Sequence, residues 1–123
     1  QAEARLPAEM PLVSAVYHNR LRSGIRLEAD PTVAYAMGGY RGRLFYKDLE
    51  IESPYNPYKY AGLPPGPICA PGKAAIDAAL YPDTKCRAVY FVAKGDGGHI
   101  FSLTLREHLA AVESVRRSRG VSD

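Results

Sequence analysis

The stretch AVYFVAKGDGGHIFSLTLRE, residues 88–107, decides the fold. Its first six residues are apolar, β-branched or aromatic, which predicts a buried strand over residues 88–93. Gly95-Asp96-Gly97-Gly98 has the composition of a hairpin turn, so residues 99–103 are expected to return as the antiparallel partner strand. Thr104 followed by Glu107 forms a capping box, which predicts a final helix ending near Arg119.

Helical signals precede this hairpin. Apolar residues recur at helical spacing from Leu12 to Leu21, with Pro11 in the first turn and Gly24 as a C-cap. Residues 1–6 are typical of the end of a helix that begins upstream, since Gln1-Ala2-Glu3-Ala4 already has helical character. These signals predict one long helix close to the start of the chain, with a second helix ending just before it.

Two further helices are predicted in the middle of the chain. Asp30-Pro31-Thr32 is a helix start, with Asp30 as the N-cap and Pro31 at the first helical position. Pro71 opens another helix, which Pro82 ends. With the hairpin, the expected fold class is α+β, with helices around a small antiparallel β-sheet.

The segment from Ser53 to Gly72 contains too many prolines and glycines for regular structure. Ordered loops of this length are uncommon in compact domains and are usually functional. Its tyrosines and Asn56 can contact a ligand, or they can pack beneath a proline-braced wall. Both interpretations stay open at the level of sequence.

Composition limits the class of protein. A chain of 123 residues with 46% hydrophobic and 24% charged residues has room for one compact globular domain. No run approaches the roughly 18 apolar residues of a membrane-spanning helix. The net charge of +3 tolerates an anionic polymer, but the basic cluster at residues 116–119 lacks interleaved aromatics, so nucleic-acid binding is not expected.

Cys69 and Cys86 lack the spacing of metal ligands, so no metal site is expected. They can form one disulfide or remain thiols. A thiol-hydrolase triad of Cys69, His99 and Asp96 is a weaker alternative, because prolines surround Cys69 and it does not lie at a helix start, where reactive thiolates are stabilised.

Several segments, in one order, resemble a known family. Together they cover nearly the whole chain, from Glu3 to about Val112. They are residues 1–4 (QAEA), 16–21 (VYHNRL), 27–33 (LEADPTV), 53–58 (SPYNPY), 62–68 (GLPPGPI), 90–93 (YFVA) and 95–102 (GDGGHIFS). On these segments the chain resembles the MltG/YceG-like endolytic murein transglycosylases.

The resemblance implies a lyase that cleaves the β-1,4 bond between MurNAc and GlcNAc in peptidoglycan and leaves 1,6-anhydro-MurNAc ends. Such an enzyme needs one acid/base and no cofactor, because the C6 hydroxyl of the sugar attacks C1. The family's catalytic glutamate is the second of two acidic residues spaced two apart. That position falls on Glu3, and the first falls on Gln1, a departure from the pattern.

Spacing alone does not choose the acid. Glu3 has small and apolar neighbours, which makes its carboxylate harder to explain as a surface charge. Glu9 is near a helix start, where an acidic residue stabilises the helix dipole, and Asp30 is assigned to a cap. Glu50 and Glu52 are typical of solvated loop charges. Glu3 is therefore the expected catalytic residue mainly through the resemblance.

The expected substrate-binding residues come from three parts of the chain. Aromatic faces stack on sugar rings, and an amide can bond hydroxyl or N-acetyl groups. His99 follows the predicted hairpin turn, where a structural hydrogen bond is the competing explanation. The expected set is Tyr55, Asn56, Tyr58, His99, Ser102 and Arg20.

The resemblance also implies an organisation. Residues 1–123 are expected to be one transglycosylase catalytic domain, with a membrane anchor and a LysM-like domain upstream. The expected location is the bacterial plasma membrane, with the catalytic domain on its extracytoplasmic side. The expected partners are nascent glycan strands and cell-wall synthases, and membrane contact is expected only through the anchor. A non-catalytic peptidoglycan-binding or scaffold domain is the alternative function.

Overall fold

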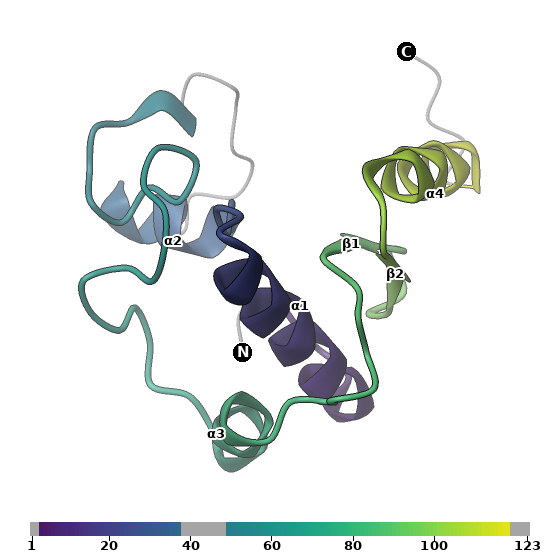
Figure 1. The fold of residues 1–123 in the computed structure, drawn as a ribbon, viewed down its shortest axis with the longest axis horizontal. Helices are drawn as coiled ribbons and strands as arrows, with labels where there is room; N and C mark the ends of the chain where they lie inside the picture. Colours follow the sequence, from purple (N-terminus) through teal and green to yellow (C-terminus); the bar gives the residue numbers. More distant parts are fainter. Residues whose placement is uncertain (1–2, 38–48, 119–123) are drawn as a thin grey trace. The chain divides into compact units, whose positions relative to one another are not determined.

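The computed structural model describes residues 3–37 and 49–118 (Figure 1). Two compact units make up the chain: Gln1–Asn19 with Pro71–Asp123, and Arg20–Ala70. The described residues contain four α-helices and one two-stranded antiparallel sheet, so the predicted α+β class is confirmed. In this described part, no helix has the length and apolar character needed to cross a bilayer.

The hairpin of the first unit forms as predicted. β1 (Tyr90–Ala93) pairs antiparallel with β2 (His99–Ser102), and Phe91 lies opposite Phe101. The turn between the strands has Gly95 and Gly97 at positive φ, a conformation that glycine adopts without steric cost.

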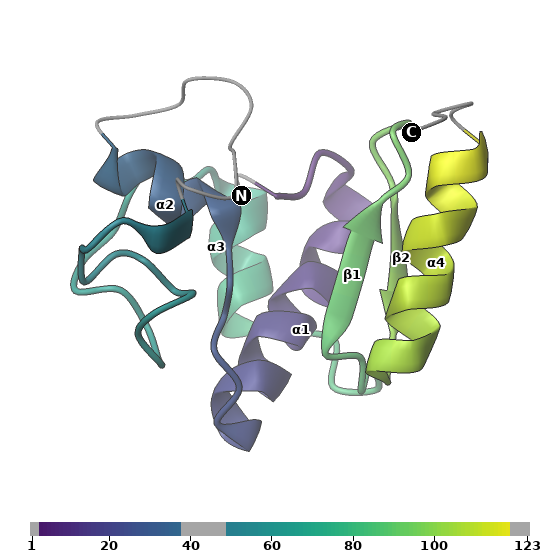
Figure 2. The ribbon, with the colours of Figure 1, turned by 90° about the horizontal axis from the view of Figure 1, so that it is seen from above.

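The hairpin lies between two helices in Figure 2. On one face, Phe91 meets Tyr17 of α1 edge to face, with ring centroids 5.8 Å apart. On the other face, Tyr90 stacks on His108 of α4 at 5.0 Å. Because side chains alternate along a strand, His99 shares the face of Phe101, the face turned toward α1.

α4 (Leu105–Ser118) begins at the predicted capping box. The Thr104 hydroxyl accepts the Glu107 amide at 3.2 Å, and the Glu107 carboxylate accepts the amides of Leu103 and Thr104 at 3.0 and 3.2 Å. These bonds occupy amide groups that a helix start otherwise leaves unpaired.

α1 (Met10–Ser23) contacts other parts of the first unit through polar side chains near its middle. The Asn19 amide donates to the carbonyls of Cys86 and Ala88 at 3.0 and 2.9 Å, which fixes the approach to β1. The His18 ring bonds the carbonyl of Ala79, at the end of α3 (Lys73–Leu80), at 2.9 Å.

The expectation that residues 1–6 end a helix is wrong for residues 3–6, which form a bend and extended chain. Leu6 has φ −89° and ψ 118°, because the ring of Pro7 disfavours the helical conformation in the residue before it. A short 3-10 turn, η1 (Pro7–Glu9), then leads into α1.

The second unit begins with the last turn of α1. Gly24 has φ +72°; its amide bonds the Leu21 carbonyl at 3.3 Å, and the Ile25 amide bonds the Arg20 carbonyl at 2.9 Å. This pair of bonds is a Schellman motif, so the predicted C-cap is confirmed.

α2 (Asp30–Ala36) starts where predicted, but the role given to Asp30 is wrong. The N-cap is Ala29, and no side chain caps the helix. The Asp30 carboxylate instead accepts the hydroxyl of Tyr58 at 2.6 Å. Residues 51–72 contain no helix or strand, which confirms the predicted irregular loop.

Gly24→Ala should lower the free energy of unfolding by about 1 kcal/mol, because a side chain at this φ is strained. No atom lies within 4 Å of a Cβ added there, so the effect isolates the backbone. Gly24→Asn is the matched control, since asparagine tolerates this conformation better. Chemical denaturation measures the free energy of unfolding of both variants. Equal stability of the two variants would contradict the left-handed conformation of Gly24.

Candidate functional site

Glu9, in η1, links two distant parts of the first unit. One carboxylate oxygen lies 2.9 Å from Nδ1 of His99, and the other accepts the His99 backbone amide at 3.2 Å. The two side chains are 17% and 5% exposed. A single carboxylate therefore fixes both the ring and the backbone at the start of β2.

Aromatic rings surround the imidazole of His99. The ring centroids of Phe91 and Phe101 lie 5.2 and 6.2 Å from it. Apolar walls of this kind exclude water and strengthen the interaction between Glu9 and His99.

The turn before His99 is held by its own carboxylate. Asp96 accepts the amide of Gly98 at 2.8 Å. This hydrogen bond lowers the pKa of the Asp96 carboxyl below its ordinary 3.8, with a smaller contribution from the charge of Lys94.

The N-terminal segment runs beside this turn. A Cβ added at Gly97 would meet Leu6 at 3.7 Å and Arg5 at 4.0 Å. Glu3 lies two residues before Arg5 on the same segment; it is half-buried, and its neighbour Ala4 is buried. The first unit thus brings the chain around Glu3 to the hairpin that carries His99.

Ser102 is also in β2 but does not share the face of His99. It is 4% exposed, lies opposite Tyr90, and belongs to the face turned toward α4. The structure therefore does not bring Ser102 together with His99.

In the second unit, Asn56 organises the proline-rich loop from within. Its side chain is fully buried; its amide group donates to the carbonyls of Leu49 and Ile51 at 2.9 and 2.8 Å, and its oxygen accepts the Tyr58 amide at 3.0 Å. Asn56 was expected to bond a sugar directly. In this structure its hydrogen bonds instead hold the loop.

The two tyrosines of the expected site are partly exposed and held from different sides. The Tyr55 ring lies 4.8 Å from that of Tyr35. The Tyr58 hydroxyl donates to Asp30, as described above. Their positions leave part of each ring accessible to a ligand.

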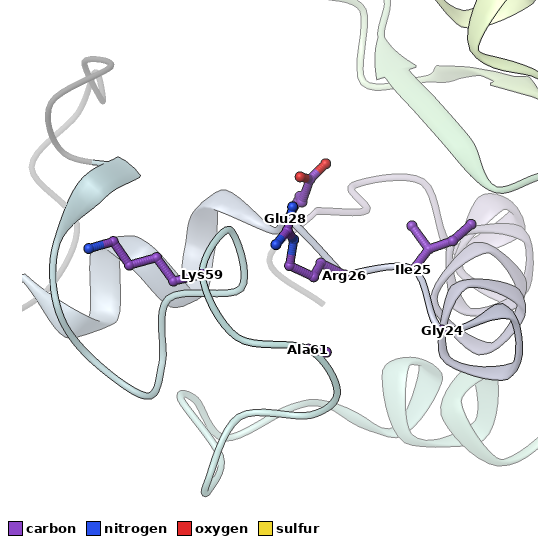
Figure 3. Close-up of a pocket in the computed structure, with 6 residues that line it drawn as sticks. All are labelled: Gly24, Ile25, Arg26, Glu28, Lys59 and Ala61. Carbon is purple, nitrogen blue, oxygen red and sulfur yellow. The ribbon is translucent and has the colours of Figure 1, made fainter.

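Arg20 holds residues that line a cavity in the second unit. Its guanidinium is buried and donates to the Arg26 carbonyl at 2.6 Å. Glu28 follows at a positive φ of 51°, a conformation uncommon for non-glycine residues. The cavity beside them measures about 430 Å³ (Figure 3) and is lined by Gly24, Ile25, Arg26, Glu28, Lys59 and Ala61. Its mixed charges suit a polar ligand.

Glu52 and Tyr60 form a hydrogen-bonded pair on the exposed side of the loop. The Tyr60 hydroxyl and then Lys59 lower the pKa of Glu52, and the bond to Glu52 raises the pKa of Tyr60. These groups are exposed, in agreement with the sequence-based view of Glu52 as a solvated charge.

The two cysteines are free, and Cys69 is exposed, but the partners of the alternative thiol triad are engaged elsewhere. The proposed triad partner Asp96 bonds its own turn, while Glu9 occupies the Nδ1 of His99. Across residues 3–37 and 49–118, no three histidine, cysteine or acidic side chains group in a way that could hold a metal ion.

Sequence reasoning missed Glu9 as a partner of His99, since it explained this residue by the helix dipole. The two residues are 90 positions apart, and no local pattern relates them. The only available signal was that a buried histidine after a glycine turn requires an acceptor.

The profile of the YceG-like family matches residues 1–114, and the chain belongs to this family. The chain is 45% identical over 119 residues, or 97% of its length, to an endolytic murein transglycosylase of Bacillus subtilis. It is 31% identical over 106 residues, 82% of its length, to the protein of that name from Streptococcus pneumoniae. It spans 33% and 19% of these two relatives.

A solved structure has the same fold. It is a yceG-like protein from Listeria monocytogenes, which matches with a TM-score of 0.81 and 45% sequence identity. The match covers 89% of this chain and 36% of the Listeria chain.

Asn56→Asp should lower the free energy of unfolding by about 2–4 kcal/mol, because it replaces a buried donor by a carboxylate facing two carbonyl oxygens. Denaturant unfolding measures the loss. Tyr60→Phe is the control: it removes only an exposed hydroxyl and should change stability little. Similar values for the two variants would refute the role of Asn56.

The Asp96 carboxyl should titrate below 3.8, because the Gly98 amide stabilises its charged form. Its contribution to stability is then present above the unfolded pKa and lost as the pH falls through the lower folded pKa. A carboxyl carbon NMR titration measures this midpoint. An Asp83→Asn protein, which keeps the hairpin turn intact, serves as an assignment control, and a midpoint at or above 3.8 would disprove the bond in solution.

Proposed function

We propose that this chain is the catalytic part of an endolytic lytic transglycosylase that cleaves peptidoglycan glycan strands during cell-wall synthesis. The observation that carries the proposal is its 45% identity, over 97% of its length, to a Bacillus subtilis protein named endolytic murein transglycosylase. Membership of the YceG-like family over residues 1–114 supports it. Residues 1–123 then act as one catalytic domain.

Glu3 is the proposed acid/base. Its carboxyl protonates the oxygen of the β-1,4 bond between MurNAc and GlcNAc as the bond to C1 breaks. The C6 hydroxyl of MurNAc attacks C1 and returns its proton to the Glu3 carboxylate, which closes a 1,6-anhydro ring. The half-buried position of Glu3 supports this role, since partial exclusion of water strengthens the interactions of its carboxyl with a bound sugar.

The remaining residues of the proposed set act on the glycan in two ways, each within its own unit. Tyr55 and Tyr58 offer partly exposed rings for stacking on sugars, and His99 offers a ring nitrogen. Asn56 and Arg20 act indirectly. The buried side chain of Asn56 holds the loop that carries the tyrosines, and that of Arg20 holds the backbone of Arg26 in the wall of the cavity. Ser102 also belongs to the set and acts only indirectly, through the hairpin, since it is buried on the face of β2 opposite to His99.

The proposed setting follows from the same function. Glycan strands are the substrate, and cell-wall synthases that produce them are the proposed protein partners. The place of action is the extracytoplasmic side of the bacterial plasma membrane, where an upstream anchor would hold the catalytic domain.

Glu3→Gln in the full-length protein should reduce cleavage of purified peptidoglycan by about 10²–10⁴-fold, because the amide cannot transfer the proton. Mass spectrometry should find 1,6-anhydro ends with the wild type. Glu113→Gln is the matched control, because Glu113 lies on α4 and pairs with Arg116 and Arg117 of the same helix. Circular dichroism checks the fold of both variants.

Three outcomes would contradict the proposal. Reducing ends in place of anhydro ends would make the enzyme a hydrolase. Full activity of Glu3→Gln would remove Glu3 from the mechanism. Glycan binding without cleavage, by both the wild type and the variant, would instead favour a non-catalytic binding domain.

A further inference from the structure

Glu9 offers two acceptor oxygens and His99 meets both with donors. A carboxylate accepts hydrogen bonds but donates none when ionised. The 2.9 Å contact with Nδ1 therefore requires the proton of the imidazole to be on Nδ1, while the second oxygen accepts the backbone amide. The carboxylate thus selects one tautomer of the ring and fixes its orientation.

The other ring nitrogen is left for a ligand. Nε2 of His99 makes no hydrogen bond to any residue in 3–37 or 49–118, although the side chain is only 5% exposed. In the neutral ring with its proton on Nδ1, Nε2 is an acceptor. An acceptor of this kind, on a side chain that is otherwise buried, suits a sugar hydroxyl or the N–H of an N-acetyl group.

The position of the pair fits such a role. Glu9 lies six residues after Glu3, and the segment between them contacts the turn before His99 through Leu6 and Arg5. Phe91 and Phe101 flank the ring, so the fixed imidazole sits in apolar surroundings, where one correctly placed acceptor discriminates strongly.

We propose that Glu9 is a positioning residue of the transglycosylase: it holds His99 with Nδ1 protonated, so that Nε2 accepts a hydrogen bond from a hydroxyl or N-acetyl group of the glycan. This inference rests on the proposed function. This positioning role of Glu9 requires the contact between its carboxylate and the His99 ring, whereas stabilisation of a helix dipole would require only its negative charge.

Glu9→Gln provides a sharp test of the tautomer. A glutamine offers one oxygen and one NH₂ group where the carboxylate offered two oxygens. The His99 backbone amide can only donate, so it takes the oxygen, and the NH₂ group then faces Nδ1. The ring must move its proton to Nε2, which turns the acceptor into a donor. Nitrogen and carbon NMR shifts of His99, recorded above the pH at which histidine ordinarily titrates, distinguish the two forms.

Activity of the full-length protein provides the second readout. Glu9→Gln should lower kcat/KM on peptidoglycan by about 10–100-fold, the usual effect of removing a partner that orients a functional histidine. Glu9→Asp keeps both acceptor oxygens and should restore part of the loss together with the Nδ1 tautomer. Glu107→Gln is the matched control, because Glu107 also accepts two backbone amides in this unit but does not touch His99.

The outcomes separate this inference from the function on which it rests. An unchanged tautomer in Glu9→Gln, or a loss of activity no greater than that of Glu107→Gln at equal folded fraction, would overturn the role of Glu9. If the wild type cleaves no glycan, the proposed function fails. Binding of uncross-linked glycan strands then decides the inference: weaker binding by Glu9→Gln supports it, and equal binding overturns it.

Discussion

The carboxylate of Glu9 is the constraint on which the first unit depends. It joins residues 90 positions apart, in η1 just before α1 and at the start of β2, through two hydrogen bonds to His99. Because both side chains are largely buried, neither partner can be left unpaired without a cost of about 1–3 kcal/mol. The hairpin, the segment after Glu3 and the first turn of α1 are therefore fixed relative to one another.

The second unit uses a buried amide for the same purpose. Asn56 satisfies two carbonyl groups and one amide of a loop that prolines prevent from forming a helix or strand. Backbone groups in an irregular segment need such partners, since no regular ladder supplies them. Tyr58 is then held by Asp30 of α2, so the loop presents its tyrosines on a fixed support.

Family membership and these local structures support one functional account. A lytic transglycosylase needs one carboxyl for proton transfer and a surface that holds sugars, and no cofactor has to be placed. In the proposal, Glu3 supplies the proton and His99 a fixed hydrogen-bonding group. Glu9 holds the hairpin of the first unit and Asn56 holds the loop of the second, each from a largely buried position and through backbone contacts.

Elements with local causes could be predicted from the amino-acid sequence alone. The hairpin turn, the capping box at Thr104, the Schellman motif at Gly24 and the irregular proline loop follow from residues within a few positions of one another. Tertiary structure decided the partners of the polar side chains. Asp30 bonds Tyr58 instead of capping α2, and Glu9 bonds His99, because hydrogen bonds between distant residues depend on packing, which short-range patterns do not encode.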